Sequence, residues 1–275
     1  MAPPKRGLKL RSRTRNYQQQ HKRGCLQKKS SSFALKGDSM SKRKAKQAAN
    51  TVQKNNLVLR DINPLTDNQR VMFQEYDSGY NLFVHGYAGT GKSFLSLFLA
   101  LDEIEETGDY DGVILIRSVV PSRDMGFLPG SIKEKSRVYE TPYVQIVNDL
   151  YSRGDAYTLL KDRGIIDFET TSFLRGCTWS NKIIIVDEIQ NMSWTELYTI
   201  LSRVGERSKI ILCGDMRQTD LKKNESGLGH MMQVLKMMKN MKFIEFERED
   251  IVRSSFVKEL IIKSTEYQDI LGYNL

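Results

Sequence analysis

The chain has 275 residues, of which 40% are hydrophobic and 27% are charged, a composition typical of a globular protein. No uncharged apolar run approaches the roughly 18 residues that a membrane-spanning helix needs, and the first residues lack the apolar core of a secretory signal. The three cysteines, Cys25, Cys177 and Cys213, form neither a disulfide framework nor a zinc pattern. We therefore expect reduced thiols, a cytoplasmic location and no membrane partner.

The charge is concentrated at the N-terminus. Residues 1–50 hold 15 Lys and Arg and one acid, a net charge of +14, whereas the whole chain carries +9, so residues 51–275 sum to −5. This composition predicts a disordered basic arm at 1–48, followed by one folded domain at 49–275. Such an arm binds nucleic-acid phosphates by releasing counterions. A role in solubility or targeting, including that of an organelle transit peptide, stays open.

From Leu57 onward, strand-like and helical patterns alternate. The predicted strands are 81–85, 112–117, 166–171, 182–187, 209–214 and 242–247. The predicted helices are 92–106, 140–153, 193–204, 227–239 and 255–270. Three of the strands are almost wholly apolar, as expected for parallel strands that are covered on both faces. The pattern predicts a doubly wound α/β domain with a mostly parallel sheet and a ligand site at the carboxyl ends of the strands.

A phosphate-binding loop follows the first predicted strand. Its residues are Gly86, Tyr87, Ala88, Gly89, Thr90, Gly91, Lys92 and Ser93, which fit the pattern G-x-x-x-x-G-K-[ST]. In such a loop the backbone amides surround the phosphates, Lys92 places a positive charge on the outer phosphates, and Ser93 offers a hydroxyl to Mg²⁺. A purely structural glycine-rich turn is the alternative, and the strand before and helix after the loop argue against it.

Two acidic residues follow the apolar strand 182–187. Asp187 ends that strand, where an acid holds Mg²⁺ through water, and Glu188 comes next. Because successive strand residues point in opposite directions, Glu188 is offset from the metal and suits a base or a positioner of the attacking water. A helix cap is the alternative, but Ser193 and Glu196 already form a capping box. We expect a metal-and-base pair.

A further apolar strand leads into "CGDMRQTDL", which brings the polar Gln218 to the nucleotide. A polar group at this place senses the terminal phosphate. The chain has no Asn-Lys-x-Asp motif for reading guanine, so adenine is the expected base and ATP with Mg²⁺ the expected ligand.

At this point the chain resembles a known family. The segments "HGYAGTGKS", "MGFLPGSIKEK", "FLRGCTW", "IIIVDEIQNM", "CGDMRQTDL" with "SGL" after it, and "EDIVRSSFV" resemble, in order, the blocks of the PhoH family of P-loop ATPases, over about residues 60–262. The short length and the basic leader resemble bacteriophage members, which implies the host cytoplasm. The family is similar to the first motor domain of superfamily-one helicases, and this similarity implies a RecA-like fold.

The helicase similarity implies roles for particular residues. "LTDNQ" resembles the helicase Q-motif, which makes Gln69 the adenine contact; a helix N-cap at Thr66 or Asp67 is compatible with that role. Gln218 lies in a motif that contacts the γ-phosphate, and Gln190 in one that couples hydrolysis to movement. The segment 116–121 resembles a motif that meets a nucleic-acid strand.

Arg253 matches an arginine of the family block "EDIVRSS". An arginine finger stabilises the charge on the transferred phosphoryl group. Members of the family are hexamers, which implies that Arg253 reaches the site of a neighbouring subunit. An ion pair with Asp250 or Glu249 is the alternative reading, and Arg175 is a second candidate finger.

The resemblance implies a ring-forming, helicase- or translocase-like ATPase that acts on RNA or single-stranded nucleic acid. The chain has no second motor domain, so any translocation has to be shared between subunits. Two other functions stay open: a regulatory ATPase switch that assembles without translocating, and a P-loop kinase or phosphotransferase. Glu188 disfavours the kinase reading, because kinases often lack a glutamate directly after the metal-binding aspartate.

Overall fold

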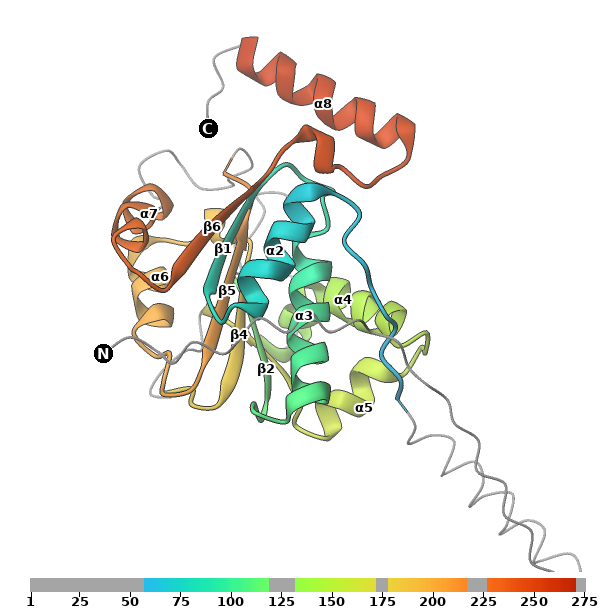
Figure 1. Cartoon of the computed structure of the whole chain (residues 1–275), viewed down its shortest axis with the longest axis vertical. Coiled ribbons are helices and arrows are strands. Elements are labelled where there is room, and N and C mark those ends of the chain that lie inside the picture. The colour runs from blue at the N-terminus through green and yellow to red at the C-terminus, as the bar shows by residue number, and fades with distance from the viewer. Residues whose placement is uncertain (1–56, 119–131, 172–177, 217–226, 271–275) are drawn as a thin grey trace, which may run out of the picture. The chain divides into compact units, whose positions relative to one another are not determined.

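The computed structural model describes residues 57–118, 132–171, 178–216 and 227–270 (Figure 1). The predicted arm at 1–48 and the predicted domain boundary at 49 lie outside the described residues. So do Gln218 and Arg175. Within the described ranges, no helix has the length and apolar character needed to cross a membrane.

A six-stranded sheet forms the centre of the domain, in the order β3-β2-β4-β5-β1-β6. The strands are β1 (Asn81–Gly86), β2 (Gly112–Arg117), β3 (Ile166–Thr170), β4 (Lys182–Asp187), β5 (Lys209–Gly214) and β6 (Met241–Phe246). Every pair of neighbouring strands in it is parallel. The predicted parallel α/β sheet is therefore confirmed, with strand bounds within one residue of the expected ones.

Seven helices are described, and the 3-10 turns η2 (Ile189–Asn191) and η3 (Arg248–Asp250) accompany them. The helices are α2 (Asp67–Asp77), α3 (Lys92–Thr107), α4 (Ile132–Leu150), α5 (Ala156–Asp162), α6 (Trp194–Leu201), α7 (Leu228–Lys236) and α8 (Ser255–Ile270). α6 and α7 end three residues before the expected ends, and α2 was expected only as a helix start near Thr66 or Asp67. Two others differ more. α4 begins at residue 132 rather than 140. Pro142 therefore lies inside the helix and not in its first turn, which is where proline is favoured. α5 was not expected, because seven residues are too few to display a helical period.

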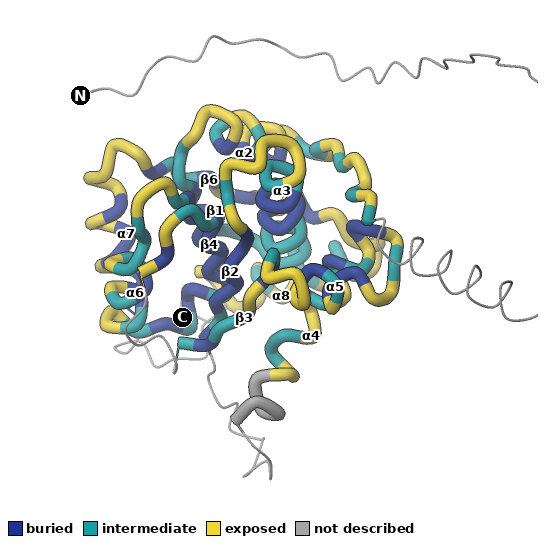
Figure 2. Tube along the Cα trace, turned by 90° about the horizontal axis from the view of Figure 1, so that it is seen from below, coloured by how far each residue is buried: buried dark blue, intermediate teal, exposed yellow. Residues whose placement is uncertain are grey.

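The sheet is covered on both faces, as a doubly wound fold requires. Successive residues of β4 alternate between two hydrophobic cores: Ile183 and Ile185 pack with α2, α3, α4 and α5, whereas Ile184 and Val186 pack with α6 and α7. Figure 1 shows the same division of the helices, and Figure 2 shows the buried strands between them. Each such buried aliphatic side chain contributes about 1.5–3 kcal/mol. Both cores hold the ends of the strands in fixed positions.

The carboxyl ends of β1, β5 and β4 meet at one edge of the sheet. β5 lies between β1 and β4, with His85 of β1 opposite Gly214 of β5. On the far side of β4, Asp187 lies opposite Arg117 of β2. This register brings the phosphate-binding loop, Asp187 and the turn after β5 together, although they are far apart in sequence.

Candidate nucleotide-binding site

The phosphate-binding loop is held in place by the last strand of the sheet. Gly86 has φ +118°, and a Cβ at this position would lie 2.0 Å from the carbonyl oxygen of Phe246. That oxygen accepts a hydrogen bond from the Tyr87 amide at 3.0 Å, and the Gly89 carbonyl accepts one from the Val252 amide at 3.0 Å. Only glycine fits position 86, because any side chain would collide with the backbone of β6.

The loop presents backbone donors at the start of α3. Gly89 and Gly91 adopt left-handed conformations with φ of +73° and +90°. Within the described ranges, no backbone carbonyl accepts the amides of Gly89 or Gly91. These amides lie beside the positive end of the α3 dipole, so they form a site for an anion such as a phosphate.

Lys92 reaches back over the loop. Its Nζ donates to the carbonyl oxygens of Gly86 at 2.9 Å and Tyr87 at 2.6 Å. Burial lowers the pKa of the Lys92 ammonium, and the negative charge of Asp215 partly opposes this shift. The ammonium is thus placed where the outer phosphates of a nucleotide would replace loop carbonyls as its partners.

Asp187 is the hub of a small oxygen-rich cluster. Its Oδ2 accepts hydrogen bonds from Ser93 Oγ at 2.8 Å and from Tyr143 Oη at 2.8 Å. Its Oδ1 accepts one from the Glu188 amide at 3.0 Å. Burial raises the pKa of the Tyr143 hydroxyl well above its usual value, so the phenol stays protonated and acts as a donor. Sequence reasoning missed Tyr143, which no motif marks.

The residues of this cluster fit Mg²⁺, which prefers oxygen ligands and keeps several waters. Across the described ranges, no group of three or more His, Cys, Asp and Glu side chains has the arrangement of a metal site. A cation that is held largely by nucleotide phosphates needs no such group. Ser93 and Asp187 are therefore suited to complete the coordination of a Mg²⁺ that arrives with a triphosphate.

Glu188 leaves the strand in an unusual conformation. Its φ of 57° and ψ of 42° lie in the left-handed region, where a non-glycine residue costs on the order of 1 kcal/mol. The chain therefore turns at Glu188, so its side-chain direction does not simply continue the alternation of β4. Burial and the nearby Asp187 raise the pKa of its carboxyl, whereas Arg117, Gln190 and Lys92 lower it. A raised pKa suits a carboxylate that accepts a proton from water.

Gln190 joins the ends of β4 and β5. Its side chain is buried, with Nε2 donating to Glu188 Oε2 and Oε1 accepting from the Asp215 amide at 3.0 Å. Gly214 packs against the side-chain amide of Gln190, because a Cβ on Gly214 would be 2.9 Å from Gln190 Oε1. Gln190 thus holds one carboxylate oxygen of Glu188 and ties it to the next strand.

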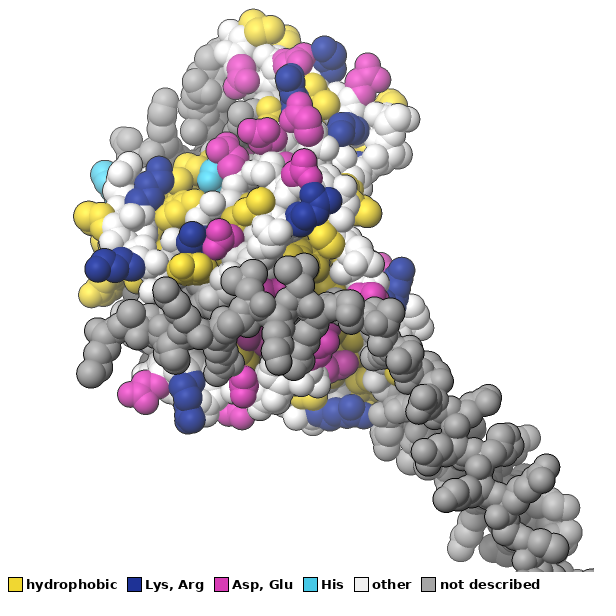
Figure 3. Space-filling model, viewed as in Figure 1, with side chains coloured by type: hydrophobic (Ala, Val, Ile, Leu, Met, Phe, Trp, Pro, Cys, Tyr) yellow, Lys and Arg dark blue, Asp and Glu magenta, His cyan; other side chains and the backbone are white. Residues whose placement is uncertain are grey.

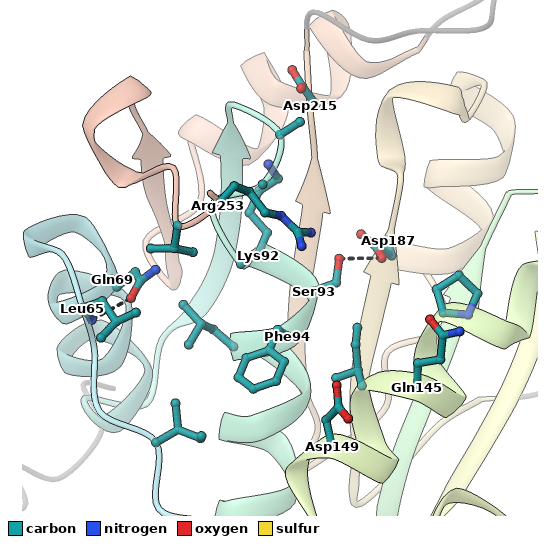
Figure 4. Close-up of a pocket in the computed structure, with 18 of the residues that line it drawn as sticks. Leu65, Gln69, Lys92, Ser93, Phe94, Gln145, Asp149, Asp187, Asp215 and Arg253 are labelled. Carbon is teal, nitrogen blue, oxygen red and sulfur yellow. Dashed lines mark hydrogen bonds between the residues drawn. The ribbon is translucent and has the colours of Figure 1, made fainter. Parts of the chain in front are cut away.

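Lys92, Ser93, Asp187 and Glu188 line one cavity of about 640 Å³ (Figure 4). Gln69 lines it from α2: its Nε2 donates to the Thr90 carbonyl at 3.0 Å, and its Oε1 accepts from the Leu65 amide at 2.8 Å. One N–H and one lone pair of this amide remain for a base. Thr66 is the N-cap of α2, and its side chain accepts a hydrogen bond from the Gln69 amide. The expected cap is confirmed, and the adenine contact stays a prediction.

Arg253 lies in the cavity of its own chain. A Cβ on Gly89 would be 2.9 Å from Arg253 Cγ, and Figure 4 shows the side chain extending over the loop toward Ser93. Among the described residues, Arg253 pairs with neither Asp250 nor Glu249, the two partners considered in the sequence analysis. Asp250 instead accepts from Asn68 Nδ2 at 2.8 Å, and Glu249 pairs with Arg248. Arg253 therefore lines the cavity of its own chain, and its expected reach to a neighbouring subunit stays a prediction.

Two walls of the cavity were not expected from the sequence. One is the segment before α2, which contributes Ile62, Asn63 and Leu65. The other is a face of α4, which contributes Pro142, Gln145, Ile146 and Asp149. Apart from Leu65, which begins "LTDNQ", no motif marks these residues, because they meet the loop only through the packing of α4 and the preceding segment on α3.

Comparison with known proteins agrees with this geometry. The sequence profile described as "PhoH-like protein" matches residues 61–264, which is most of the chain. The chain belongs to the PhoH family. The expected resemblance to the family is thereby confirmed, whereas the bacteriophage origin stays a prediction. The loop, the Ser93–Asp187 pair and the parallel sheet make this PhoH-like chain a P-loop protein.

The PhoH relatives are longer than this chain. A PhoH-like protein of Bacillus subtilis is 35% identical over 182 residues, which cover 66% of this chain and 56% of the relative. A PhoH-like protein of Mycobacterium leprae is 30% identical over 216 residues, 78% of this chain and 61% of the relative. Protein PhoH of Escherichia coli is 30% identical over 208 residues, which cover 74% of this chain and 58% of the relative. The chain spans about three fifths of these relatives.

Solved structures show more distant likeness. The large terminase of a thermophilic bacteriophage aligns with a TM-score of 0.44 and 12% identity over 75% of this chain and 50% of the terminase. The Pif1 helicase of Candida albicans aligns with a TM-score of 0.37 and 16% identity over 72% of this chain and 44% of the helicase. The family assignment rests on the sequence match.

Proposed function

We propose that this chain binds ATP with Mg²⁺ and hydrolyses it. The observation that carries the proposal is the hydrogen bond of 2.8 Å between Ser93 Oγ and Asp187 Oδ2 at the start of α3. It joins the hydroxyl of the phosphate-binding loop to the acid at the end of β4. Glu188, the candidate base, is the next residue along the chain.

Each residue has a role in the proposed reaction. The loop amides and Lys92 bind the phosphates, while Ser93 and Asp187 hold the cation in place. A bound Mg²⁺ neutralises charge on the phosphates as the terminal group is transferred. Glu188 orients the attacking water and accepts its proton.

The remaining proposed roles rest on single residues. Arg253 stabilises charge on the transferred group, and its position favours action on the nucleotide of its own chain over the expected action on a neighbour. Gln69 contacts adenine, and Gln218, which lies outside the described residues, reports the terminal phosphate.

We further propose that hydrolysis is coupled to movement on RNA or single-stranded DNA by subunits that assemble as a ring in the cytoplasm. The basic arm at 1–48, with its net +14 over the first 50 residues, supplies an electrostatic grip on the strand. The described body lacks a comparable concentration of charge on the face in Figure 3, where side chains of both signs are interspersed. We infer from this net charge that the arm contributes most of the attraction for phosphate, and its removal should reduce the salt dependence of binding.

The decisive experiment measures ATP turnover by the full chain with Mg²⁺, alone and with a polyribonucleotide or a polydeoxyribonucleotide. Stimulation by a strand supports the motor. Turnover that no strand changes would favour the regulatory switch, and phosphate transfer to a nucleoside or sugar without free phosphate would favour the kinase. Absence of Mg²⁺-dependent turnover under all these conditions contradicts the proposal.

A further inference from the structure

Arg117 lies beside Glu188, the residue that activates water in the proposed function. It ends β2 and stands opposite Asp187 in the parallel pairing with β4. Its Nη2 is 3.9 Å from Glu188 Oε1, and its guanidinium carbon is 5.9 Å from the centre of the Tyr139 ring. Its guanidinium makes no hydrogen bond to any described residue. Toward the described part of the chain, the five N–H donors of this group therefore have no hydrogen-bond acceptor.

The two oxygens of the Glu188 carboxylate are held in different ways. Oε2 accepts from Gln190, whose side chain is only 2% exposed and is itself fixed by the Asp215 amide. Oε1 faces Arg117, and this contact is open to solvent, with side-chain exposures of 24% for Arg117 and 38% for Glu188. Of these two contacts, the Arg117 contact is the one that a ligand outside the protein can reach.

A phosphodiester is a better partner for Arg117 than Glu188 is in this geometry. Guanidinium groups bind phosphate through two parallel hydrogen bonds of about 2.7–2.9 Å, shorter than the 3.9 Å separation from the carboxylate. Arg117 also lies at the carboxyl end of its strand, at the edge of the sheet where ligands bind in open α/β folds. A strand that crosses this edge would therefore compete with Glu188 for the guanidinium.

We propose that Arg117 is a positioning residue through which nucleic acid controls Glu188. Without a strand, Arg117 draws the carboxylate toward β2. A backbone phosphate of a bound strand takes the guanidinium, and Glu188 is then free to orient water at the terminal phosphate of the nucleotide. This inference rests on the proposed ATPase function and adds the regulation of the same site.

The first test measures ADP formation at saturating ATP and Mg²⁺, with and without single-stranded homopolymers of RNA and DNA. The variants are Arg117→Gln, Arg117→Lys and, as a control, Arg137→Gln, an exposed arginine of α4 away from the nucleotide. Arg117→Gln should raise the unstimulated kcat and bring the stimulation to within about twofold of none, with an unchanged KM for ATP. Arg117→Lys should keep part of the stimulation, and Arg137→Gln should behave as the parent chain.

The second test does not depend on hydrolysis. Binding of a labelled single-stranded oligonucleotide is measured by fluorescence anisotropy, without ATP, over a range of salt concentrations. Arg117→Gln should weaken binding roughly fivefold and reduce the slope of log K against log salt by about one. Glu188→Gln should tighten binding, because it frees Arg117 from its competing partner, and the double variant should lose that gain.

Three outcomes overturn the proposal. Loss of ATP affinity and of unstimulated turnover in Arg117→Gln would mean that Arg117 serves the nucleotide. Equal strand affinity in the parent, Glu188→Gln and Arg117→Gln chains would mean that no competition exists. Equal stimulation by inorganic phosphate and by a strand would mean that the ligand is a free anion. If the parent chain turns over no ATP, the proposed function fails, while the binding measurements still decide whether Arg117 links the strand to Glu188.

Discussion

The hydroxyl of Ser93 and the carboxylate of Asp187 are joined by a hydrogen bond of 2.8 Å, although 94 positions separate the two residues. Ser93 lies in the first turn of α3, which follows β1, and Asp187 ends β4. β5 lies between β1 and β4 in the sheet. The pair therefore joins the phosphate-binding loop to the end of β4, where the proposed function places the cation.

Lys92→Ala should remove nucleotide binding. The variant loses the ammonium that is buried over the loop carbonyls and leaves the phosphate charge uncompensated. Charged hydrogen bonds of this kind contribute about 1.5–3 kcal/mol, so affinity for a fluorescent ATP analogue should fall at least tenfold. Lys161→Ala, an exposed lysine of α5 that pairs with Glu140, is the control. Unchanged affinity in Lys92→Ala would contradict the proposed role.

Glu188→Gln should separate binding from hydrolysis. Glutamine keeps the size of the side chain and a hydrogen-bond partner for Gln190, but it cannot accept a proton from water. ATP affinity should stay within about threefold of the parent value, while kcat should fall by about 10²-fold or more. Equal losses of binding in Glu188→Gln and Lys92→Ala would mean that the two residues do not have separate roles.

Tyr143→Phe should raise the Mg²⁺ requirement. The variant removes one of two hydroxyl donors to Asp187 Oδ2 and keeps the buried ring, so the carboxylate loses orientation but not its surroundings. Loss of one such bond is worth on the order of 1 kcal/mol, so half-maximal turnover should need roughly fivefold more Mg²⁺. Tyr157→Phe removes a hydroxyl bonded to Glu140 and serves as the control. An identical Mg²⁺ titration in both variants would argue against this role.

Gly86→Ala should destabilise the domain more than Gly108→Ala does. Both glycines have positive φ, but a Cβ on Gly86 would stand 2.0 Å from the Phe246 carbonyl, whereas nothing lies within 4 Å of one on Gly108. Gly108→Ala should cost about 1–2 kcal/mol, from backbone strain alone. The midpoints of urea unfolding compare the two, and a smaller shift for Gly86→Ala would contradict the close approach of β6.

His85 should reduce stability in mild acid. Burial lowers the pKa of its imidazole, with the nearby Lys92 and Lys236 acting in the same direction and Glu245 and Asp215 opposing them. The native state therefore prefers the neutral ring. Its stability contribution is complete above the unfolded pKa of about 6.5 and is lost as the pH falls from there through the lowered native value. Unfolding midpoints between pH 5 and 7.5 should fall less steeply in His85→Gln, and parallel profiles would exclude His85 as the source.

Much of the fold could be predicted because its central strands are short apolar runs. β2, β4 and β5 match the expected ranges residue for residue. A strand that is covered on both faces has no polar side to obscure its pattern. The start of α4 and the whole of α5 could not be predicted, since one contains a proline and the other is too short for a period.

The candidate site also has a part that the sequence predicts and a part that it does not. The loop and the acids Asp187 and Glu188 are contiguous in sequence, so their spacing is informative. Tyr143 and Arg117 act on those acids from α4 and β2, and their contacts exist only once helix and strand are packed. The backbone bond from Val252 to Gly89 places Arg253 beside the loop of its own chain, a contact that no motif marks, and its expected role at a neighbouring subunit stays a prediction.

The backbone hydrogen bonds that Phe246 and Val252 make with the phosphate-binding loop have a consequence for the synthesis of the chain. Phe246 and Val252 fix a loop that the ribosome finishes about 150 residues earlier. A nascent chain that ends before these residues contains every letter of the loop motif and yet lacks the backbone partners that shape it. If the chain binds ATP as proposed, we expect this ability to arise late, when the final edge strand docks, and we expect a chain whose translation stops earlier not to bind ATP.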